Sequence, residues 1–307
     1  MKFENIRVMN FEGALRGMRN PKNSWHLADS KFDIGDSDCM GSEVSDVASS
    51  WLEFLNEDLN NEDKRTEIED WLLSNGVIDG GNLCDCYQYA FIGPKDMKLA
   101  QQLIRGGSEH RKFLRQIQVS VDITAPLYWW KEFDTYKVGT TANSTSTMHK
   151  ITAKPITLDC FEIDNMSDLY ELDNEHNMGK LEAEDENFRP IWTYDDAHSF
   201  PYDIVAYCED LRQKYLKTRD YRYWKELIRW LPESWLQTRT VTMNYENILS
   251  MLHQRKFHKL DEWSGTEEDG VLTPTFIKFI EALPYANHFL AFLEIYNCDE
   301  VPLIDFS

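Results

Sequence analysis

The six residues from Gln118 to Ile123 constrain the fold of this chain more than any other segment. Val119, Val121 and Ile123 alternate there with polar side chains, a pattern typical of a β-strand that buries one face. Pro126 lacks a backbone N–H and closes the segment. The chain is therefore expected to contain a sheet with a packed layer over one side.

Helical periodicity appears on both sides of this strand. Apolar residues recur at helical spacing over residues 42–75 around an acidic break at 56–63, which predicts two helices. Asp96 is expected to cap a helix that runs to residue 104, and Ser108 to cap the next one. Further elements are predicted as follows: strands at 6–11 and 87–92, a turn at 79–82, helices at 12–18, 201–217, 221–230 and 244–255, and a last helical pair within 275–296.

Net charge limits the possible partners. The chain carries a formal charge of -21, which repels phosphate backbones and anionic lipid surfaces. Duplex nucleic acid and membranes are therefore not expected as partners, and a nucleic-acid mimic is a minor alternative. The acidic segment 164–190 is interpreted as a solvated surface loop, with an active-site lid as the alternative.

Cysteine usage and the termini favour a cytoplasmic protein. The six cysteines lack the dense spacing of a secreted disulfide scaffold. Cys84 and Cys86 form a C-x-C pair without a second pair at zinc-site spacing, so no metal is expected. The N-terminus alternates charged and apolar residues, and no apolar run is long enough to span a bilayer.

The segment from Gly107 to Lys150 carries the most specific motif, GSEHRKFLRQIQVSVDITAPLYWWKEFDTYKVGTTANSTSTMHK. It resembles the signature of the flavin-dependent thymidylate synthases, in which a histidine precedes an alternating strand, an R-H-R triplet and an S-x-N-E-x-S-x-R-Y run. An ungapped register from His110 brings Asn143 and Ser146 onto the asparagine and the second serine of that run, with Thr141 at the first serine.

A second segment, LPESWLQTRTVTMNYENILSMLHQR over residues 231–255, is similar to the helix of that family that carries an asparagine and ends in arginine. Asn244 and Arg255 stand at the family separation. The two segments and the residues between them cover roughly half of the chain, in the order that the family shows.

The resemblance implies an α/β (α+β) fold with a twisted, largely antiparallel sheet flanked by helices, assembled as a homotetramer with shared sites. Residues 96–300 would form the thymidylate-synthase-like domain, and residues 1–95 an N-terminal strand and helical extension packed on it. The chain resembles divergent members of the family that phages and prophages carry, which implies a phage origin. The family methylates dUMP with FAD and a folate.

The resemblance also assigns roles to residues, with Arg255 activating the pyrimidine by its fixed charge. The implied nucleotide-binding residues are Lys137, Thr141, Asn143, Ser144, Ser146 and Arg255, and the implied flavin-side residues are His110, Arg115 and Asn244. The alternative to a ligand-binding role for His110 and Arg255 is a structural role, in packing or in helix capping. A core position is expected for Trp129 and Trp130 and for the stripe Trp224, Trp230 and Trp235.

Several family residues are replaced. Tyr136, Lys137 and Val138 stand at the R-H-R triplet, Met148 and His149 at the arginine–tyrosine pair, and Glu246 at an arginine on the flavin side. The reversed charges at Arg115 and Glu246 suggest that these two side chains pair. Two functions stay open: a flavin-dependent enzyme that modifies a deoxyuridylate-like nucleotide, and a catalytically degenerate scaffold that binds a nucleotide or a protein.

Overall fold

The computed structural model describes residues 1–35, 37–80, 87–163, 199–265, 267–268, 271–272 and 275–290. The chain divides into two compact units, each built from more than one stretch of sequence. The first comprises residues 1–123, 134–143 and 239–307, and the second comprises residues 124–133 and 144–238. The domain boundary predicted between residues 95 and 96 rests on the family resemblance, and it stays a prediction.

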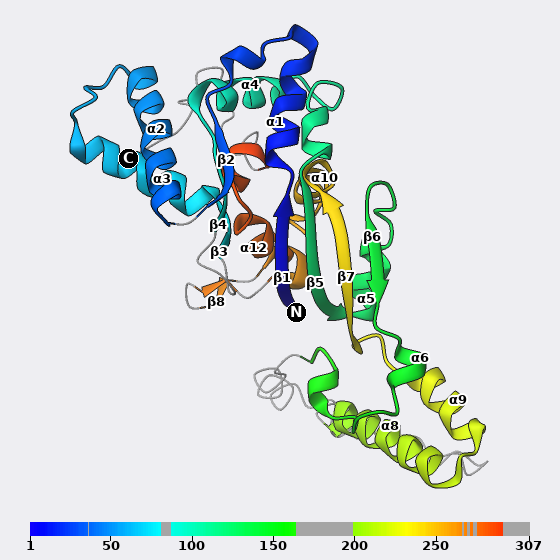
Figure 1. Cartoon of the computed structure of the whole chain (residues 1–307). Coiled ribbons are helices and arrows are strands. Elements are labelled where there is room, and N and C mark those ends of the chain that lie inside the picture. The colour runs from blue at the N-terminus through cyan, green and yellow to red at the C-terminus, as the bar shows by residue number, and fades with distance from the viewer. Residues whose placement is uncertain are drawn as a thin grey trace, which may run out of the picture. The chain divides into compact units, whose positions relative to one another are not determined.

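The main sheet has the strand order β1-β5-β7-β6. Its strands are β1 (Lys2–Met9), β5 (Gln118–Pro126), β7 (Leu236–Asn244) and β6 (Thr141–Ser144). Side-chain hydrogen bonds fix the β5 and β7 register, because the hydroxyls of Thr124 and Thr238 bond each other and the hydroxyl of Thr240 donates to the carboxylate of Asp122. Residue numbers thus fall along one strand as they rise along the other, and Figure 1 shows neighbouring strands pointing in opposite directions. The expected largely antiparallel sheet with flanking helices is confirmed.

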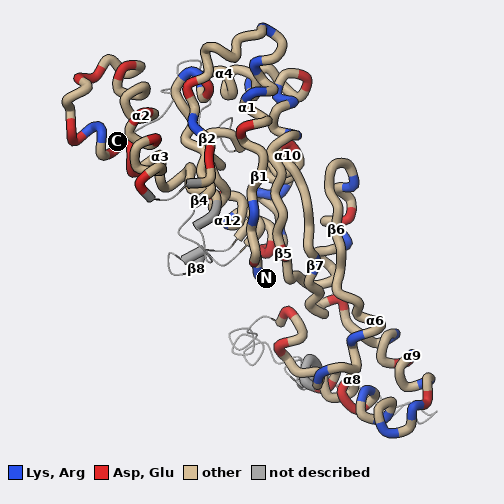
Figure 2. The backbone as a smooth tube through the Cα atoms, viewed as in Figure 1, with Lys and Arg blue, Asp and Glu red and all other residues tan. Residues whose placement is uncertain are grey.

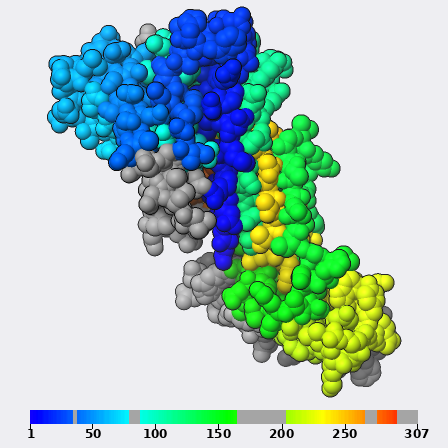
Figure 3. All heavy atoms as spheres, in the orientation of Figure 1, coloured from blue at the N-terminus to red at the C-terminus, as the bar shows by residue number. Residues whose placement is uncertain are grey.

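The alternation that predicted β5 sets its packing. Val119, Val121 and Ile123 are buried, as are Val241 and Met243 on β7. Helix α12 (Phe276–Glu281) lies against β1, since the ring of Phe3 stacks on that of Phe279 at 4.8 Å. Figure 3 shows that much of β1 remains at the surface, in keeping with its mostly exposed burial pattern.

The N-terminal part of the first unit adds a second sheet and several helices. The sheet has the order β2-β4-β3, with β2 (Lys31–Gly35), β4 (Tyr87–Phe91) and β3 (Val77–Gly80) all antiparallel. Helices α2 (Ser37–Leu55) and α3 (Glu62–Gly76) pack together through Trp51 and Trp71, whose ring centroids are 5.7 Å apart. Figure 2 shows acidic residues spread along both helices, with few basic ones.

Helices α1 (Phe11–Arg19) and α4 (Pro94–Arg105) are joined by a buried ion pair. The Nε of Arg19 lies 2.6 Å from a carboxylate oxygen of Asp96. Asp96 therefore does not cap α4 as expected. Gly93 precedes the helix, and the carboxylate of Asp29 accepts from the N–H groups of Lys95 and Asp96. The prediction rested on the preference of aspartate for capping positions. In the structure, the carboxylate of Asp96 is instead buried in the ion pair with Arg19.

The second unit is mostly helical. It contains α5 (Leu127–Phe133), α6 (Thr147–Lys150), α8 (Ser199–Thr218) and α9 (Tyr221–Trp230). Its core gathers Ile151, Ile156, Phe161, Cys208, Leu211 and Leu227. Burial raises the pKa of the Cys208 thiol to about 11. Trp129 and Trp130 are fully buried as expected, but Trp230 is 61% exposed, so its core assignment is wrong.

Most predicted helices are confirmed with shifts of a few residues at their ends. The helix expected after Ser108 is instead a single 3-10 turn, η3 (Lys112–Arg115). The last helical pair is short, with α12 followed by α13 (Ala286–Phe289). The remaining small elements are η1 (Asn20–Lys22), η2 (Trp25–Leu27), η4 (Leu158–Cys160), α11 (Asp261–Ser264), β8 (Glu267–Glu268) and β9 (Val271–Leu272). The acidic segment 164–190, the Cys84–Cys86 pair and the chain after residue 290 lie outside the described residues.

Candidate functional site

Helix α10 (Tyr245–Arg255) carries two of the residues that the family resemblance selects. At its start, the side chain of Asn244 accepts from the N–H of Asn247, and the side chain of Asn247 accepts from the N–H of Asn244. This reciprocal capping box satisfies two backbone donors and fixes where the helix begins. Ile248, Leu249, Met251 and Leu252 bury one face and so set the direction in which Arg255 leaves the last turn.

Arg255 contacts two aromatic rings, those of Tyr136 and Trp263. Its guanidinium carbon is 5.4 Å from the centroid of Tyr136 and 5.2 Å from that of Trp263. Its Nε donates a hydrogen bond of 2.7 Å to the hydroxyl oxygen of Tyr136, and that hydroxyl donates to Oε1 of Gln254 at 3.1 Å. We refer to Tyr136, Gln254, Arg255 and Trp263 as the arginine cluster. These contacts hold a half-buried cation in one orientation.

The loop that supplies Tyr136 is held to α10 and β7 at several points. Asn247 donates from Nδ2 to the carbonyl of Val138 at 2.7 Å, and the hydroxyl of Thr140 donates to the carbonyl of Tyr136. Arg239 on β7 pairs with Asp134 at 2.7 Å. Gly139 adopts φ +81, and a Cβ there would come within 2.7 Å of Asn247 Oδ1, so only glycine fits. The loop that carries Tyr136 is therefore held against the first turn of α10 by Asn247 and against β7 by Arg239.

The implied nucleotide residues divide between the two units. Lys137 is exposed beside Tyr136 in the first unit, and Thr141 and Asn143 are exposed on β6. Ser144 and Ser146 belong to the second unit, where the hydroxyl of Ser146 caps α6 by accepting from the N–H of His149 and also contacts its Nδ1 at 2.7 Å. A shared anion pocket for Ser146 and Arg255 stays a prediction.

The implied flavin residues lie near the start of α10. Asn244 is almost fully buried and is engaged in the capping box. Arg115 is exposed, and its Nη2 donates to the carbonyl of Ser108 at 3.5 Å. His110 is also exposed. These three therefore lie on neighbouring elements, since η3 packs against α10.

The expected pair between Arg115 and Glu246 is replaced by another. The Nε of Arg111 donates to both carboxylate oxygens of Glu246, at 2.9 and 3.2 Å, and both side chains are largely buried. The register identified the correct glutamate but the wrong arginine. The pairing was inferred from two opposite charge reversals, and such a pattern does not distinguish Arg115 from Arg111, which lies four residues earlier.

Because the implied flavin residues lie near the start of α10, that helix end would have to help hold the flavin. A flavin dinucleotide presents a pyrophosphate, which favours a helix N-terminus with open N–H groups or cations. At α10 the capping box already uses N–H groups of the first turn, and the carboxylate of Glu246 occupies that turn with Arg111 as its counter-ion. The fit of this end of α10 to FAD is therefore poor.

Sequence reasoning did not select Gln254, Trp263 or Asn247. Trp263 lies on α11 and is fully buried, and nothing in its local sequence indicates a ring facing Arg255. Asn247 had a detectable signal, because an amide three residues after an N-cap asparagine is typical of a capping box.

Within the described part of the chain, no group of three His, Cys, Asp or Glu side chains comes together as metal ligands. None of its helices combines the length and apolarity needed to cross a bilayer.

No protein-family model matches the sequence, and no curated protein does. Solved structures do match. A flavin-dependent thymidylate synthase ThyX from Helicobacter pylori, complexed with FAD and dUMP, is 16% identical with a TM-score of 0.38, over 64% of this chain and 82% of its own.

A second structure of ThyX from Helicobacter pylori with FAD and dUMP is 13% identical, with a TM-score of 0.45, and covers 94% of this chain and 97% of its own. A UMP/dUMP methylase PolB from Streptomyces cacaoi bound with 5-Br UMP is 13% identical, with a TM-score of 0.38, over 65% and 83%.

Proposed function

We propose that this chain binds a pyrimidine nucleotide such as dUMP through Arg255, on a scaffold that resembles the flavin-dependent thymidylate synthases. The observation that carries the proposal is the arginine cluster. Tyr136, which replaces the first arginine of the triplet in one motif, is in direct contact with Arg255 at the helix end of the other motif. Chance similarity of two short motifs does not require such a contact.

The chemistry of the cluster suits a charged oxygen. The hydroxyl of Tyr136 already accepts from Nε of Arg255, so a ligand oxygen that uses this edge of the guanidinium must displace it. A neutral carbonyl forms a bond no stronger than the phenol does, whereas a charged oxygen forms one roughly twice as strong. The cluster therefore favours a phosphate, or a pyrimidine oxygen on which negative charge develops, over an uncharged base.

Arg255 also suits activation of a pyrimidine by fixed charge. Because a guanidinium keeps its proton throughout the accessible pH range, it stabilises negative charge on a ring oxygen without accepting or losing a proton. The aromatic rings of Tyr136 and Trp263 limit its movement, which reduces the reorganisation needed as the charge develops. In an active protein, FAD would supply the hydride and a folate the one-carbon unit.

A catalytically degenerate scaffold is the second candidate. It is favoured by the Arg111–Glu246 pair at the start of α10 and by the loss of both triplet arginines to Tyr136 and Val138. In this version the protein retains nucleotide binding, or presents the same surface to a protein, without redox chemistry. A phage origin would account for either form of the proposal.

Calorimetric titration with dUMP tests the binding. Arg255→Gln removes the cation, and we expect an affinity loss of about tenfold or more, the size of one charge-assisted bond. Arg16→Gln is the matched control, because Arg16 is an exposed arginine on α1. Failure of the wild-type protein to bind dUMP, or equal affinity in Arg255→Gln, would contradict the proposal.

The absorbance of the purified protein separates the two candidates. A bound flavin gives absorption bands in the visible region, and added FAD then raises the melting temperature by mass action. Colourless protein that FAD does not stabilise favours the scaffold. A homotetramer in the cytoplasm completes the proposal, and light scattering on the eluting protein measures its mass.

A further inference from the structure

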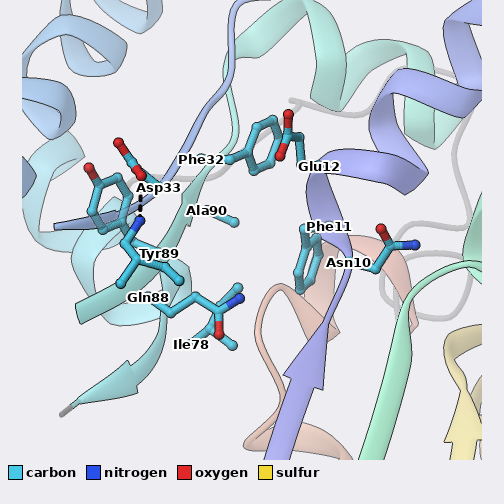
Figure 4. A pocket seen from close by; sticks show the side chains of 10 residues that line it. Asn10, Phe11, Glu12, Phe32, Asp33, Ile78, Gln88, Tyr89 and Ala90 are labelled. Atoms are coloured by element: carbon cyan, nitrogen blue, oxygen red, sulfur yellow. Dashed lines mark hydrogen bonds between the residues drawn. The ribbon is translucent and has the colours of Figure 1, made fainter. Parts of the chain in front are cut away.

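A cavity of about 300 Å³ lies in the first unit, between the start of α1 and one face of the β2-β4-β3 sheet. The register pairs Phe32 with Ala90 and Ile34 with Gln88, so these four side chains share that face. Phe11, which lies on α1, forms the wall opposite the sheet, and Ile78 on β3 also lines the cavity. Figure 4 shows the rings of Phe11 and Phe32 on either side of the space.

Polar side chains line this cavity beside the apolar ones. Figure 4 shows the carboxylate of Glu12 beside the ring of Phe32, and the amide of Gln88 near Ile78. Among the described residues, neither of these two side chains has a hydrogen-bond or ion-pair partner. Asp33 also lines the cavity, while no lysine or arginine does. The walls thus combine apolar and aromatic side chains with polar ones, and every formal charge on them is negative.

This combination matches one class of ligand. An aromatic face beside a carboxylate attracts an ammonium group, which gains both a cation–π contact and a charge-assisted hydrogen bond. The apolar floor, with Ile34 itself 68% exposed, gains from covering by a hydrocarbon or aromatic body. The net charge of -21 raises the local concentration of cations near the surface.

We propose that this cavity is a binding site for a small amphipathic ammonium compound, with its cationic group at Glu12 and its apolar body between Phe11, Phe32 and Ile34. The site is chemically unlike the arginine cluster, because a nucleotide phosphate would meet only carboxylates here. It therefore does not depend on the proposed nucleotide function.

Phenethylammonium chloride is a suitable probe, with 2-phenylethanol as its neutral counterpart and 3-phenylpropanoate as an anion. Titrations use the full chain with labelled isoleucine δ1-methyl groups, assigned by Ile34→Val and Ile78→Val. We expect saturable shifts of the Ile34 and Ile78 methyl signals with the ammonium compound, while Ile248 on α10 does not move. The alcohol is expected to bind at least about fivefold more weakly, and the anion not at all.

Glu12→Gln preserves shape and removes the charge, so the affinity for the ammonium compound should fall to that for the alcohol. Glu53→Gln removes an exposed charge on α2 and should leave the affinity unchanged. Unsaturable shifts, equal binding of the alcohol, or an unaltered affinity in Glu12→Gln would each overturn the proposal. Because the methyl signals localise the probe in wild-type protein, poor folding of a variant does not prevent the test.

Discussion

The Nε of Arg255 lies 2.7 Å from the hydroxyl oxygen of Tyr136, although 119 positions separate them in the chain. The phenol is both an acceptor, from Arg255, and a donor, to Gln254. An uncharged side chain thus stands beside the arginine at a position where the family resemblance expects a second arginine. The consequences of this exchange can be measured.

Tyr136→Phe keeps the ring beside Arg255 and removes the hydroxyl. We expect the free energy of unfolding to fall by about 1 kcal/mol, the net value of one such hydrogen bond. Modification of Arg255 by phenylglyoxal, followed by mass spectrometry, should become several-fold faster because its Nε loses a partner. Arg16 reports the intrinsic reactivity of an exposed arginine, and an unchanged ratio between the two would show that the phenol does not restrain Arg255.

The Arg111–Glu246 pair should show coupling that Arg115 lacks. A double-mutant cycle with Arg111→Gln and Glu246→Gln is expected to give a coupling free energy of about 1 kcal/mol, because the pair is charged, hydrogen-bonded through Nε and largely buried. The same cycle with Arg115→Gln in place of Arg111→Gln should be additive within about 0.5 kcal/mol. Urea unfolding measures both cycles, and a larger coupling for Arg115 would contradict the pairing.

Asn247 has two separable roles, in the capping box and in the tie to Val138. Asn247→Ala removes both, and we expect a loss of about 1–2 kcal/mol in unfolding free energy. Asn247→Asp keeps the acceptor for the N–H of Asn244 but not the donor to Val138, so its loss should be smaller. Hydrogen exchange over residues 136–140 should rise in both variants. Unchanged exchange there would mean that the tie contributes nothing.

His288 predicts a specific pH dependence. It is buried against the rings of Trp71 and Tyr285, and this burial lowers its pKa from the ordinary 6.5 to about 4. Between those two values the unfolded chain takes up a proton that the folded chain refuses, so stability falls as pH decreases from about 6.5 to about 4. The full effect is of order 3 kcal/mol at most.

The difference between wild type and His288→Leu isolates this histidine from other groups, including Asp29, whose pKa burial raises. As pH falls through that window, the wild-type denaturant midpoint should fall relative to the variant's, whichever protein is the more stable at neutral pH. At minimum, the wild-type curve should be steeper than the variant's. Parallel curves would show that His288 is not the titrating group.

Regular periodicity made much of this fold predictable. The strand at Gln118 and the helices α8, α9 and α10 follow from spacing alone, since each buries the face that its apolar residues define. The same signal was available for β7, where buried Val241 and Met243 alternate with exposed Thr240 and Thr242. It was missed because the segment was interpreted as a motif leading into a helix.

The failures lie where tertiary contacts override local preference. Asp96 is a good capping residue, but the buried guanidinium of Arg19 holds it inside α4. Trp230 has the large aromatic side chain that is typical of core residues, yet it lies at the surface, where its Nε1 donates to Glu226. The register found the neighbourhood of Arg255 and Tyr136, while Trp263 and Gln254 depend on chain segments whose approach no local pattern encodes.

The interleaved composition of the two units has a consequence for synthesis on the ribosome. The first unit lacks β7 and α10 until the stretch beginning at residue 239 has emerged, and the second is closed only by residues up to 238. The pairing of β5 with β7 and the packing of η3 against α10 therefore form only after these later residues have emerged, whereas α1 can already pack on α4 and η3.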